Sequence, residues 1–364
     1  MQTIGVLQYP WQNCHWFVSY LSDREQRVIV NGKTSEWVKV KSGVPEGALL
    51  APLLFYLFIN DLPTVVESSK CIMYADDVKI YRQISSPSDC KLLQTDLTSL
   101  CKWSVDWHLI LNPQKCHAFT ITLKKAPIFH TYCINRSPLQ RVTEVRDLGV
   151  LLDSKLTFSA HINIVVTKAN RSLGLLIRSF KTGLPGQKFD RRALLVAYFA
   201  NVRSILEYGS IVWSGAAKTH LQRLERVQHK FLMWLSARAR GADRLTSLEY
   251  RDLLHYFHVP SLEARRKQLD LVFLRNIFTS KVDSSFLTGC FFLHVPGRTV
   301  RNVSLFYVPF ARVSTVKTGV FVRLPTLAND FIRRYPQIDF FVERFATFKT
   351  SVLNYVGSVP CGAV

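Results

Sequence analysis

The chain has 364 residues, a length that accommodates two or three compact domains, and 48% of its residues are hydrophobic. This composition excludes wholesale disorder and collagen-like structure. Lys and Arg number 47 against 26 Asp and Glu, and the net charge of +21 favours a polyanionic partner over the alternative of a merely soluble basic surface.

Further sequence features narrow the class of protein. The longest apolar run, Ala48 to Ile59, has 12 residues and contains Pro52, so it is too short for a membrane span, which needs roughly 17 to 25 residues. No secretory signal is visible at the start of the chain. The eight cysteines are scattered without metal-binding spacing, which indicates reduced thiols in an intracellular protein of the nucleus or cytoplasm.

The first predicted elements are a hairpin, a loop and a helix. Residues 25–41 contain two β-rich runs around Asn31-Gly32, a strong hairpin signal. The loop Gly43–Gly47 follows, and Pro52 then marks the first turn of a helix that reaches about Asp61. Because this helix is apolar on nearly every side, we expect it to be buried.

A second hairpin and an amphipathic helix are predicted next. Residues 70–82 read as two short strands joined at Ala75-Asp76-Asp77, and apolar residues at helical spacing predict a helix from Pro87 to Trp107 with Ser86 as its N-cap. Further short strands are predicted near residues 116–122, 128–134 and 147–152.

After Phe158 the pattern becomes helical, which indicates a domain boundary. This part is strongly basic: residues 161–240 carry 14 Lys and Arg against three acidic residues, a net +11. A helix predicted over 216–236 places apolar residues on one face and Arg223, Arg226 and Lys230 on another. Short β-like runs around Val295 and Phe306 and a helical stretch over 338–355 complete the chain.

The adjacent carboxylates Asp76 and Asp77 are the main candidate for chemistry. At a separation of about 4 Å they repel by about 4 kcal/mol at an effective dielectric of about 20, and a cation offsets that repulsion. Mg²⁺ prefers carboxylate oxygens and leaves positions for water and phosphate, which suits nucleotidyl transfer. Taken alone, however, Asp-Asp in a turn is common, because Asp favours turns for local reasons.

The surroundings of this pair resemble the palm of a reverse transcriptase. Tyr74-Ala75-Asp76-Asp77 looks like the YxDD hairpin of that family, and its Asp76 lies 29 residues after Gly47, the last residue of the SGVPEG loop. Similarity to jockey-like non-LTR retrotransposons extends over roughly residues 16–355. The motifs that carry it are WFVSYLSDREQRVIV, PLLFYLFINDLP, LILNPQKC, VRDLGVLLDSKLTFSAHI, SILEYGSIVWS, LERVQHKF and LPTLANDF.

The resemblance assigns roles to individual positions. It makes Asp76 the direct ligand of Mg²⁺ or Mn²⁺ and Asp77 its partner, and it places Tyr74 and Ala75 near the primer end and the incoming nucleotide. Leu148-Gly149 resembles the segment that grips the primer. Lys115 either supplies a proton to pyrophosphate or is a solvated lysine. The nucleotide- and template-binding loop comprises Gly43, Pro45, Glu46 and Gly47.

The basic and aromatic residues after position 200 leave alternatives open. Arg223, Arg226 and Lys230 either contact the phosphates of nucleic acid or form a solvated helix face. Tyr208 and Trp213 either stack on bases or, as we favour, pack between helices.

Three departures distinguish the chain from the family pattern. The family has a further catalytic aspartate upstream of the SYLSDR segment, and no residue of this chain matches it. Glu46 replaces the usual Gln and Ala48 the usual Ser. We therefore expect an N-terminally truncated enzyme whose activity is impaired.

The resulting expectation is an α+β fold built from a partial right-hand palm, an antiparallel sheet with packed helices, followed by a mainly helical thumb-like region. The expected function is RNA-directed DNA polymerase activity with an RNA template, a DNA primer and dNTP; the alternative is a catalytically inactive nucleic-acid-binding remnant. The expected divisions are an unmatched leader (1–15), the partial palm (16–160), the basic thumb-like region (161–280) and a family-specific C-terminal region (281–364).

Overall fold

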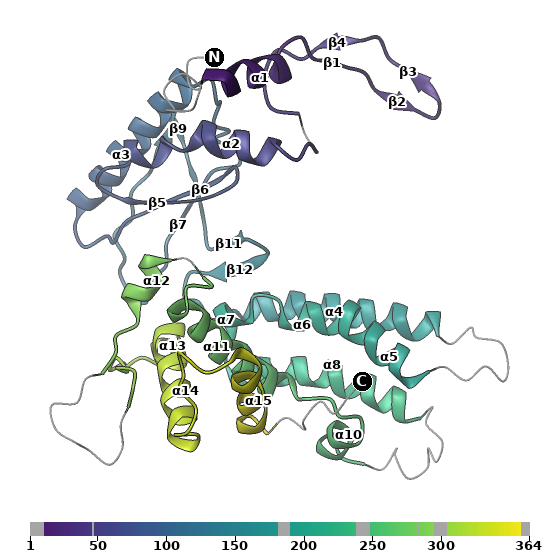
Figure 1. The fold of residues 1–364 in the computed structure, drawn as a ribbon. Helices are drawn as coiled ribbons and strands as arrows, with labels where there is room; N and C mark the ends of the chain where they lie inside the picture. Colours follow the sequence, from purple (N-terminus) through teal and green to yellow (C-terminus); the bar gives the residue numbers. More distant parts are fainter. Residues whose placement is uncertain are drawn as a thin grey trace. The chain divides into compact units, whose positions relative to one another are not determined.

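The computed structural model describes residues 11–45, 47–180, 190–237, 248–282, 284–294 and 304–357. The chain divides into two compact units (Figure 1). Unit 1 comprises Met1–Phe119 and Leu123–Val142, and unit 2 comprises Thr120–Thr122 and Thr143–Val364. Both units mix helices with short strands, which confirms the expected α+β class. None of the described helices combines the length and the hydrophobicity that crossing a bilayer requires.

Unit 1 contains α-helices joined by short strand pairs. Within the described residues every hydrogen-bonded ladder has two strands; β7 and β10 pair in parallel and the others are antiparallel. The elements of unit 1 are α1 (Trp11–Leu21), β1 (Glu25–Gln26), β2 (Ile29–Val30), β3 (Lys33–Thr34), β4 (Val38–Lys39), α2 (Ala51–Ile59), the 3₁₀ helix η1 (Leu62–Val65), β5 (Lys70–Tyr74), β6 (Asp77–Tyr81), α3 (Pro87–Asp106), β7 (His117–Phe119), β8 (Cys133–Ile134), β9 (Ser137–Pro138) and β10 (Gln140–Val142).

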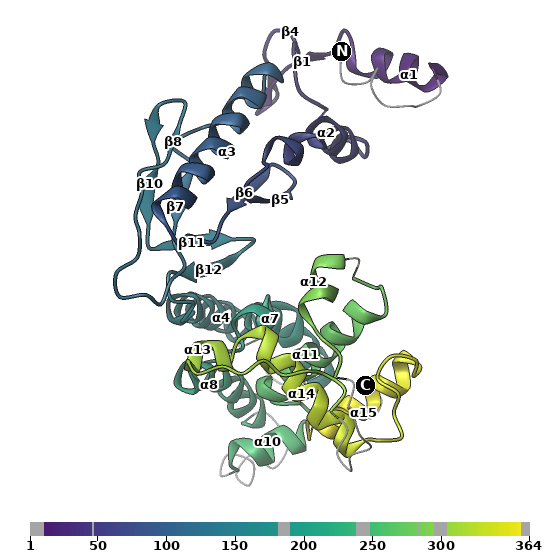
Figure 2. The ribbon, with the colours of Figure 1, turned by 90° about the vertical axis from the view of Figure 1, so that its left-hand side faces the viewer.

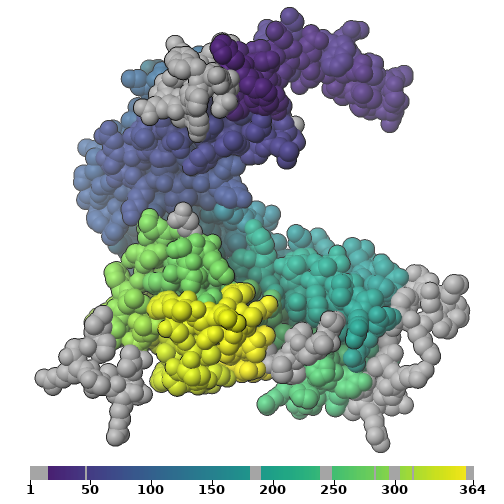
Figure 3. All heavy atoms as spheres, in the orientation of Figure 1, coloured from purple at the N-terminus to yellow at the C-terminus, as the bar shows by residue number. Residues whose placement is uncertain are grey.

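The hairpin predicted around Asn31-Gly32 is confirmed. Strand β1 pairs with β4 and β2 pairs with β3. Asn31 and Gly32 have φ values of 49° and 78°, and both being positive is what a type I′ turn requires. All side chains from Glu25 to Lys39 are exposed, and in Figure 3 this hairpin extends away from the rest of unit 1.

Helix α2 begins at Ala51 and carries Pro52 in its first turn, as predicted, but the expectation that the helix is buried is wrong for one of its faces. Ala51, Leu54 and Ile59 are buried, whereas Leu53 and Tyr56 expose 50% and 59% of their surface. One face of the helix therefore joins the core and the other remains open. The predicted helix with Ser86 at its N-terminus is confirmed as α3.

The core of unit 1 lies between α2, α3 and the β5–β6 hairpin (Figure 2). Ile59, Leu62, Leu100 and Trp103 are buried together, and side chains of the hairpin pack against them. Helix α3 also packs on β8, because Gln94 exchanges two hydrogen bonds with the backbone of Cys133. Of the strand predicted near residues 128–134, Cys133–Ile134 alone forms a strand, β8.

Unit 2 begins with a hairpin and continues as helices. The strand predicted over 147–152 is corrected: a turn at Leu148-Gly149 separates two strands. The elements of unit 2 are β11 (Glu144–Asp147), β12 (Val150–Asp153), α4 (Ser159–Ser179), α5 (Arg191–Tyr198), the π-helix η2 (Phe199–Arg203), α6 (Ser204–Glu207), α7 (Ser210–Trp213), α8 (Lys218–Ser236), α10 (Tyr250–Tyr256), α11 (Leu262–Phe278), α12 (Ser285–Cys290), α13 (Ser314–Lys317), α14 (Val320–Arg334) and α15 (Phe345–Tyr355).

Two apolar clusters hold unit 2 together. One joins β12 to the helices from α4 to α10, and the other joins α11 to α14 and α15. Helix α15 begins at Phe345, later than the predicted residue 338. The β-like run predicted around Phe306 is an isolated β-bridge between Phe306 and Leu293. The β-like run around Val295 lies outside the described residues.

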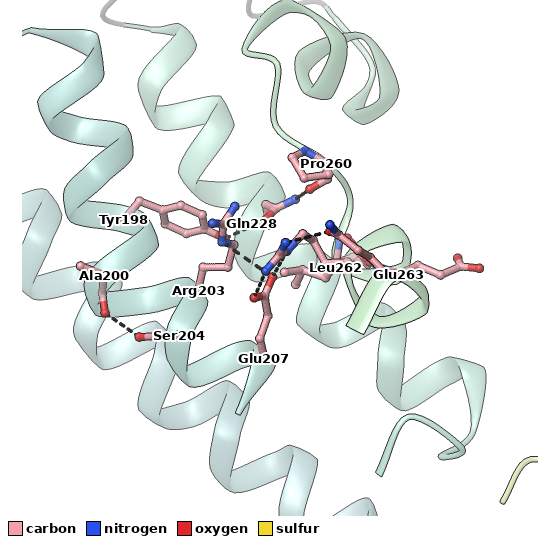
Figure 4. A network of polar contacts seen from close by, with 12 residues as sticks. Tyr198, Ala200, Arg203, Ser204, Glu207, Gln228, Pro260, Leu262 and Glu263 are labelled. Carbon is pink, nitrogen blue, oxygen red and sulfur yellow. Dashed lines mark hydrogen bonds and ion pairs between the residues drawn. The ribbon is translucent and has the colours of Figure 1, made fainter. Parts of the chain in front are cut away.

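Between these helices lies a network of polar side chains (Figure 4). Gln228 accepts a hydrogen bond from the hydroxyl of Tyr198 (3.1 Å) and donates to the carbonyl of Pro260 (3.0 Å). Glu207 accepts two hydrogen bonds of 2.9 Å from the guanidinium of Arg265. Because buried polar groups are costly unless paired, these contacts stabilise the relative positions of α5, α6, α8 and α11.

Candidate active site

The two candidate carboxylates lie at the end of the β5–β6 hairpin. Tyr74 and Asp77 are paired across the two strands, so Ala75 and Asp76 alone form the turn. Ala75 has a φ of 51°, in the left-handed region that a residue with a Cβ enters at a cost of about 1 kcal/mol. The turn is therefore short and tight, and it places Asp76 at its tip.

The hairpin presents different residues on its two faces. Met73 and Val78 are paired and pack on the core of unit 1. Since side chains alternate along a strand, the next pair, Tyr74 and Asp77, belongs to the opposite face. Tyr74 exposes 63% of its surface, and both aspartates are exposed. The strand pattern therefore directs an aromatic ring and a carboxylate away from the core.

The carboxylates of Asp76 and Asp77 form no hydrogen bond and no ion pair with the described residues. Their oxygens remain available to a ligand. Within the same residues, no group of three or more His, Cys, Asp and Glu side chains is placed to hold a metal ion. The donor set is nevertheless suitable for Mg²⁺, which is often bound by one or two carboxylates together with substrate phosphates and water.

The glycine-containing loop also belongs to unit 1. Gly43 and Gly47 have φ values of 82° and 80°, and a Cβ on either would meet no atom within 4 Å. Glycine is therefore favoured at these positions because of their positive φ and not because neighbouring atoms exclude a side chain. Pro45 is half-buried, and its carbonyl accepts the N–H of Ala48 (3.2 Å). Glu46 lies outside the described residues.

Lys115 is exposed in a turn of unit 1 after α3. Its backbone N–H donates to the carbonyl of Asn112 (3.1 Å), and its ammonium group forms no hydrogen bond or ion pair with the described residues. No contact joins it to Asp76 or Asp77. Its role as a proton donor therefore stays a prediction.

The turn that resembles a primer grip is held firmly within unit 2. Leu148 and Gly149 have φ values of 43° and 83°. The hydroxyl of Tyr208 donates to the carbonyl of Leu148 (2.8 Å), and a Cβ on Gly149 would lie 3.1 Å from the ring of Tyr208. Tyr208 itself is 58% exposed, whereas Trp213 is fully buried and donates to the carbonyl of Tyr208 (2.8 Å). Packing, the interpretation we favoured, is thus confirmed for Trp213.

Sequence reasoning missed His161, which supports the same hairpin. Its Nδ1 accepts the backbone N–H of Leu151 (3.2 Å). Burial lowers the pKa of His161 below its ordinary value, and the charge of Arg146 lowers it further. His161 and Gly149 border a recess of about 330 Å³ that Arg146, Lys168 and Tyr208 also line. A single histidine within an apolar stretch gave no signal of this contact.

Helix α8 carries the predicted basic residues in unit 2. Arg226 and Lys230 are exposed, and their side chains form no hydrogen bond or ion pair with the described residues. Arg223 is half-buried and donates to the side-chain oxygen of Asn163 on α4. The hairpin, the loop and Lys115 thus belong to unit 1, whereas the Leu148-Gly149 turn and the α8 residues belong to unit 2.

Comparison with known proteins matches the first part of the chain to a family. Residues 1–152 match the family described as "Reverse transcriptase (RNA-dependent DNA polymerase)". This range holds the β5–β6 hairpin and the Leu148-Gly149 turn. It also includes residues 1–15, which precede the first motif that resembles the family.

Similar curated proteins come from Drosophila melanogaster. The "Probable RNA-directed DNA polymerase from transposon BS" is 30% identical over 225 residues, and the "RNA-directed DNA polymerase from mobile element jockey" is 29% identical over 230 residues. These alignments cover 58% and 60% of this chain. The chain covers only 24% of the length of each relative. No solved structure matches the chain.

The similarity continues past the family match. Since 58% of 364 residues is more than 152, the alignment with the transposon BS polymerase reaches into unit 2. The chain therefore contains a reverse transcriptase domain in residues 1–152 and is related to the polymerases of jockey-like, non-LTR mobile elements.

Proposed function

We propose that this protein is an RNA-directed DNA polymerase that extends a DNA primer on an RNA template, with activity impaired because no residue of the chain matches the family's upstream catalytic aspartate. One observation carries the proposal: within the reverse transcriptase match, two adjacent carboxylates lie exposed and unpaired with described residues at the end of a tight hairpin. Paired carboxylates of this kind suit two-metal phosphoryl transfer.

The proposed reaction transfers a nucleotide to the primer. The 3′-oxygen of the primer forms a bond to the α-phosphorus of the dNTP, the bond to the β-phosphate oxygen breaks, and the proton of the 3′-hydroxyl passes to solvent. Asp76 and Asp77 would hold Mg²⁺ or Mn²⁺, which would supply electrostatic stabilisation of the negative charge that develops in phosphoryl transfer. Lys115 gives a proton to the departing pyrophosphate.

The remaining residues bind and orient the substrates. Tyr74 and Ala75 contact the primer end and the incoming nucleotide, while Gly43, Pro45, Glu46 and Gly47 form the nucleotide- and template-binding loop. Glycine suits this loop because a missing side chain lets nucleic acid approach the backbone.

In unit 2, the Leu148-Gly149 turn holds the primer strand. Its attachment to Tyr208 supports this role, since a fixed turn orients a strand better than a mobile one. Arg223, Arg226 and Lys230 of α8 contact phosphates. Of these three, Arg226 and Lys230 are the more accessible.

The test is primer extension on poly(rA)/oligo(dT) with Mg²⁺ or Mn²⁺. We expect Asp76→Asn to lower incorporation by at least about 10²-fold, because a neutral amide is a poor substitute for a charged metal ligand. Asp106→Asn is the matched control: Asp106 is also an exposed aspartate of unit 1, at the end of α3, and its loss should leave incorporation unchanged.

Two results would contradict the proposal. One is equal incorporation by the Asp76→Asn variant and the parent protein. The other is a parent protein that binds the primer–template in a salt-sensitive way but incorporates no nucleotide with either metal. That second result would favour the inactive nucleic-acid-binding remnant.

A further inference from the structure

A second recess lies in unit 2, outside the residues that match the reverse transcriptase family. Its volume is about 570 Å³, within the range of small-molecule sites. Helices α13, α14 and α15 supply most of its lining, with Ser214 after α7 and Lys267 of α11 completing it. The charged residues of the lining are Lys267, Lys317, Arg323, Asp330, Arg333 and Arg334.

Two of the five cations are neutralised by acids that do not line the recess. Lys267 pairs with Glu263 of the same helix at 2.8 Å. Arg323 pairs with Asp270, its Nε lying 2.9 Å from Oδ2 and its Nη2 3.3 Å from Oδ1. These two pairs leave three cations in the lining to be balanced by Asp330.

The remaining charges do not balance. Asp330 is shared between Arg333 at 3.6 Å and Arg334 at 3.3 Å. The ammonium group of Lys317 forms no ion pair with any described residue. One carboxylate therefore faces three cations, and the recess retains an excess of two positive charges.

The wall of the recess is held in place by contacts from several elements. Arg323 also donates to the carbonyls of Thr318 (2.8 Å) and Ile211 (2.7 Å), which ties α14 to the segments before it and to α7. A Cβ on Gly215 would collide with the carbonyl oxygen of Thr318, so these segments are in close contact. Such a wall loses little conformational entropy on binding a ligand.

Arg334 is oriented as well. The hydroxyl of Tyr355 donates to Asp330 (2.5 Å), and the guanidinium of Arg334 lies over the Tyr355 ring at 5.2 Å from its centre. A planar guanidinium held in this way can donate two parallel hydrogen bonds to a phosphate. The excess charge and this donor geometry both favour an anionic, oxygen-rich ligand.

We propose that this recess binds phosphate groups of a nucleic-acid strand, as a contact site distinct from the hairpin residues of unit 1. Lys317, Arg333 and Arg334 provide the donors. The choice of a nucleic-acid strand among phosphate ligands rests on the proposed function, which brings template and primer to this chain. The excess charge of the recess is independent of that function.

The experiment measures binding of fluorescein-labelled oligo(rA) to the full chain by fluorescence anisotropy, over a series of KCl concentrations and without dNTP or divalent ions. In the variant Lys317→Gln/Arg333→Gln we expect the salt slope to fall by about 1.4, because each contact to a single strand contributes about 0.7. At about 0.1 M salt this corresponds to about 25-fold weaker binding.

The matched control is Arg251→Gln/Lys349→Gln, which removes two exposed cations of unit 2 that do not line the recess. We expect it to bind as the parent does. Equal weakening by both double variants would overturn the proposal, since charge anywhere on the unit would then suffice. If the first variant melts at a lower temperature than the parent, Lys317→Gln alone replaces it, with an expected loss of slope of about 0.7.

A second ligand separates a strand from a small phosphate compound. Tripolyphosphate that binds the parent as tightly as oligo(rA), and is lost in the Lys317→Gln/Arg333→Gln variant, would overturn the assignment to a strand. The anisotropy assay contains no dNTP and no divalent ions, so its result does not depend on polymerisation. Failure of primer extension would contradict the proposed function and leave the proposal for this recess intact. Equal weakening by the two double variants would overturn the proposal for this recess and leave the proposed function intact.

Discussion

At the scale of single residues, two turns depend on positive φ angles in different ways. Gly149 adopts a φ of 83°, and a Cβ at this position would lie 3.1 Å from the ring of Tyr208. Both the backbone conformation and the nearby ring therefore favour glycine here. Ala75 adopts a φ of 51° in the hairpin that carries the carboxylates. Residues held in unfavourable backbone regions often occur at functional sites, which is consistent with the proposed role of this turn.

The variant Gly149→Ala should lower the free energy of unfolding by about 1 to 2 kcal/mol, because alanine is disfavoured at this φ and its Cβ crowds Tyr208. Urea denaturation of the purified chain measures the change. Gly174→Ala is the control, since Gly174 lies inside α4 with open space around its Cα and alanine there should be stabilising by about 0.5 to 1 kcal/mol. Destabilisation of similar size in both variants would refute this explanation.

At the scale of secondary-structure elements, the start of α3 shows how a local signal fixes a boundary. Ser86 and Asp89 form a reciprocal capping box. The carboxylate of Asp89 accepts hydrogen bonds from the backbone of Ser85 and Ser86, from the Ser86 hydroxyl and from Arg82. These donors, the Ser85 N–H foremost, hold the pKa of Asp89 well below its ordinary value of 3.8.

This lowered pKa predicts an acid-sensitive contribution to stability. The folded chain binds the proton of Asp89 less readily than the unfolded chain does, so the contribution is present above about pH 4 and is lost as the pH falls toward the lowered value. Asp89→Asn should therefore destabilise the chain at neutral pH and flatten the dependence of its urea midpoint on pH below about 4. An unchanged pH dependence, matching that of Asp106→Asn, would contradict the assignment.

Other elements were predictable for similar local reasons. The turn pair Asn31-Gly32 and the helical spacing of apolar residues before Trp107 each specify one structure through neighbouring residues. The open face of α2 and the break at Leu148-Gly149 were not predictable in this way. An apolar helix carries no signal of which side finds a partner, and a strand pattern does not reveal a turn whose geometry depends on the distant Tyr208.

At the scale of the whole molecule, the order of motifs along the chain predicted more than any single motif. The YADD sequence alone is a common turn, but its place among the SGVPEG loop and later motifs indicated the reverse transcriptase family that residues 1–152 match. The basic recess of unit 2 was not predictable, because Ser214, Lys267, Lys317 and Tyr355 are far apart in the sequence. Only folding brings these residues together, and no periodic pattern connects them.

Binding of divalent ions at the β5–β6 hairpin can be observed directly. The test is Mn²⁺ titration of the isotope-labelled chain with primer–template and a non-hydrolysable dNTP, read as paramagnetic broadening of backbone amide signals. We expect Tyr74 to Val78 to broaden first in the parent protein and the Asp76→Asn/Asp77→Asn variant to lose this effect. Broadening that avoids the hairpin, or that persists unchanged in the double variant, would contradict this expectation.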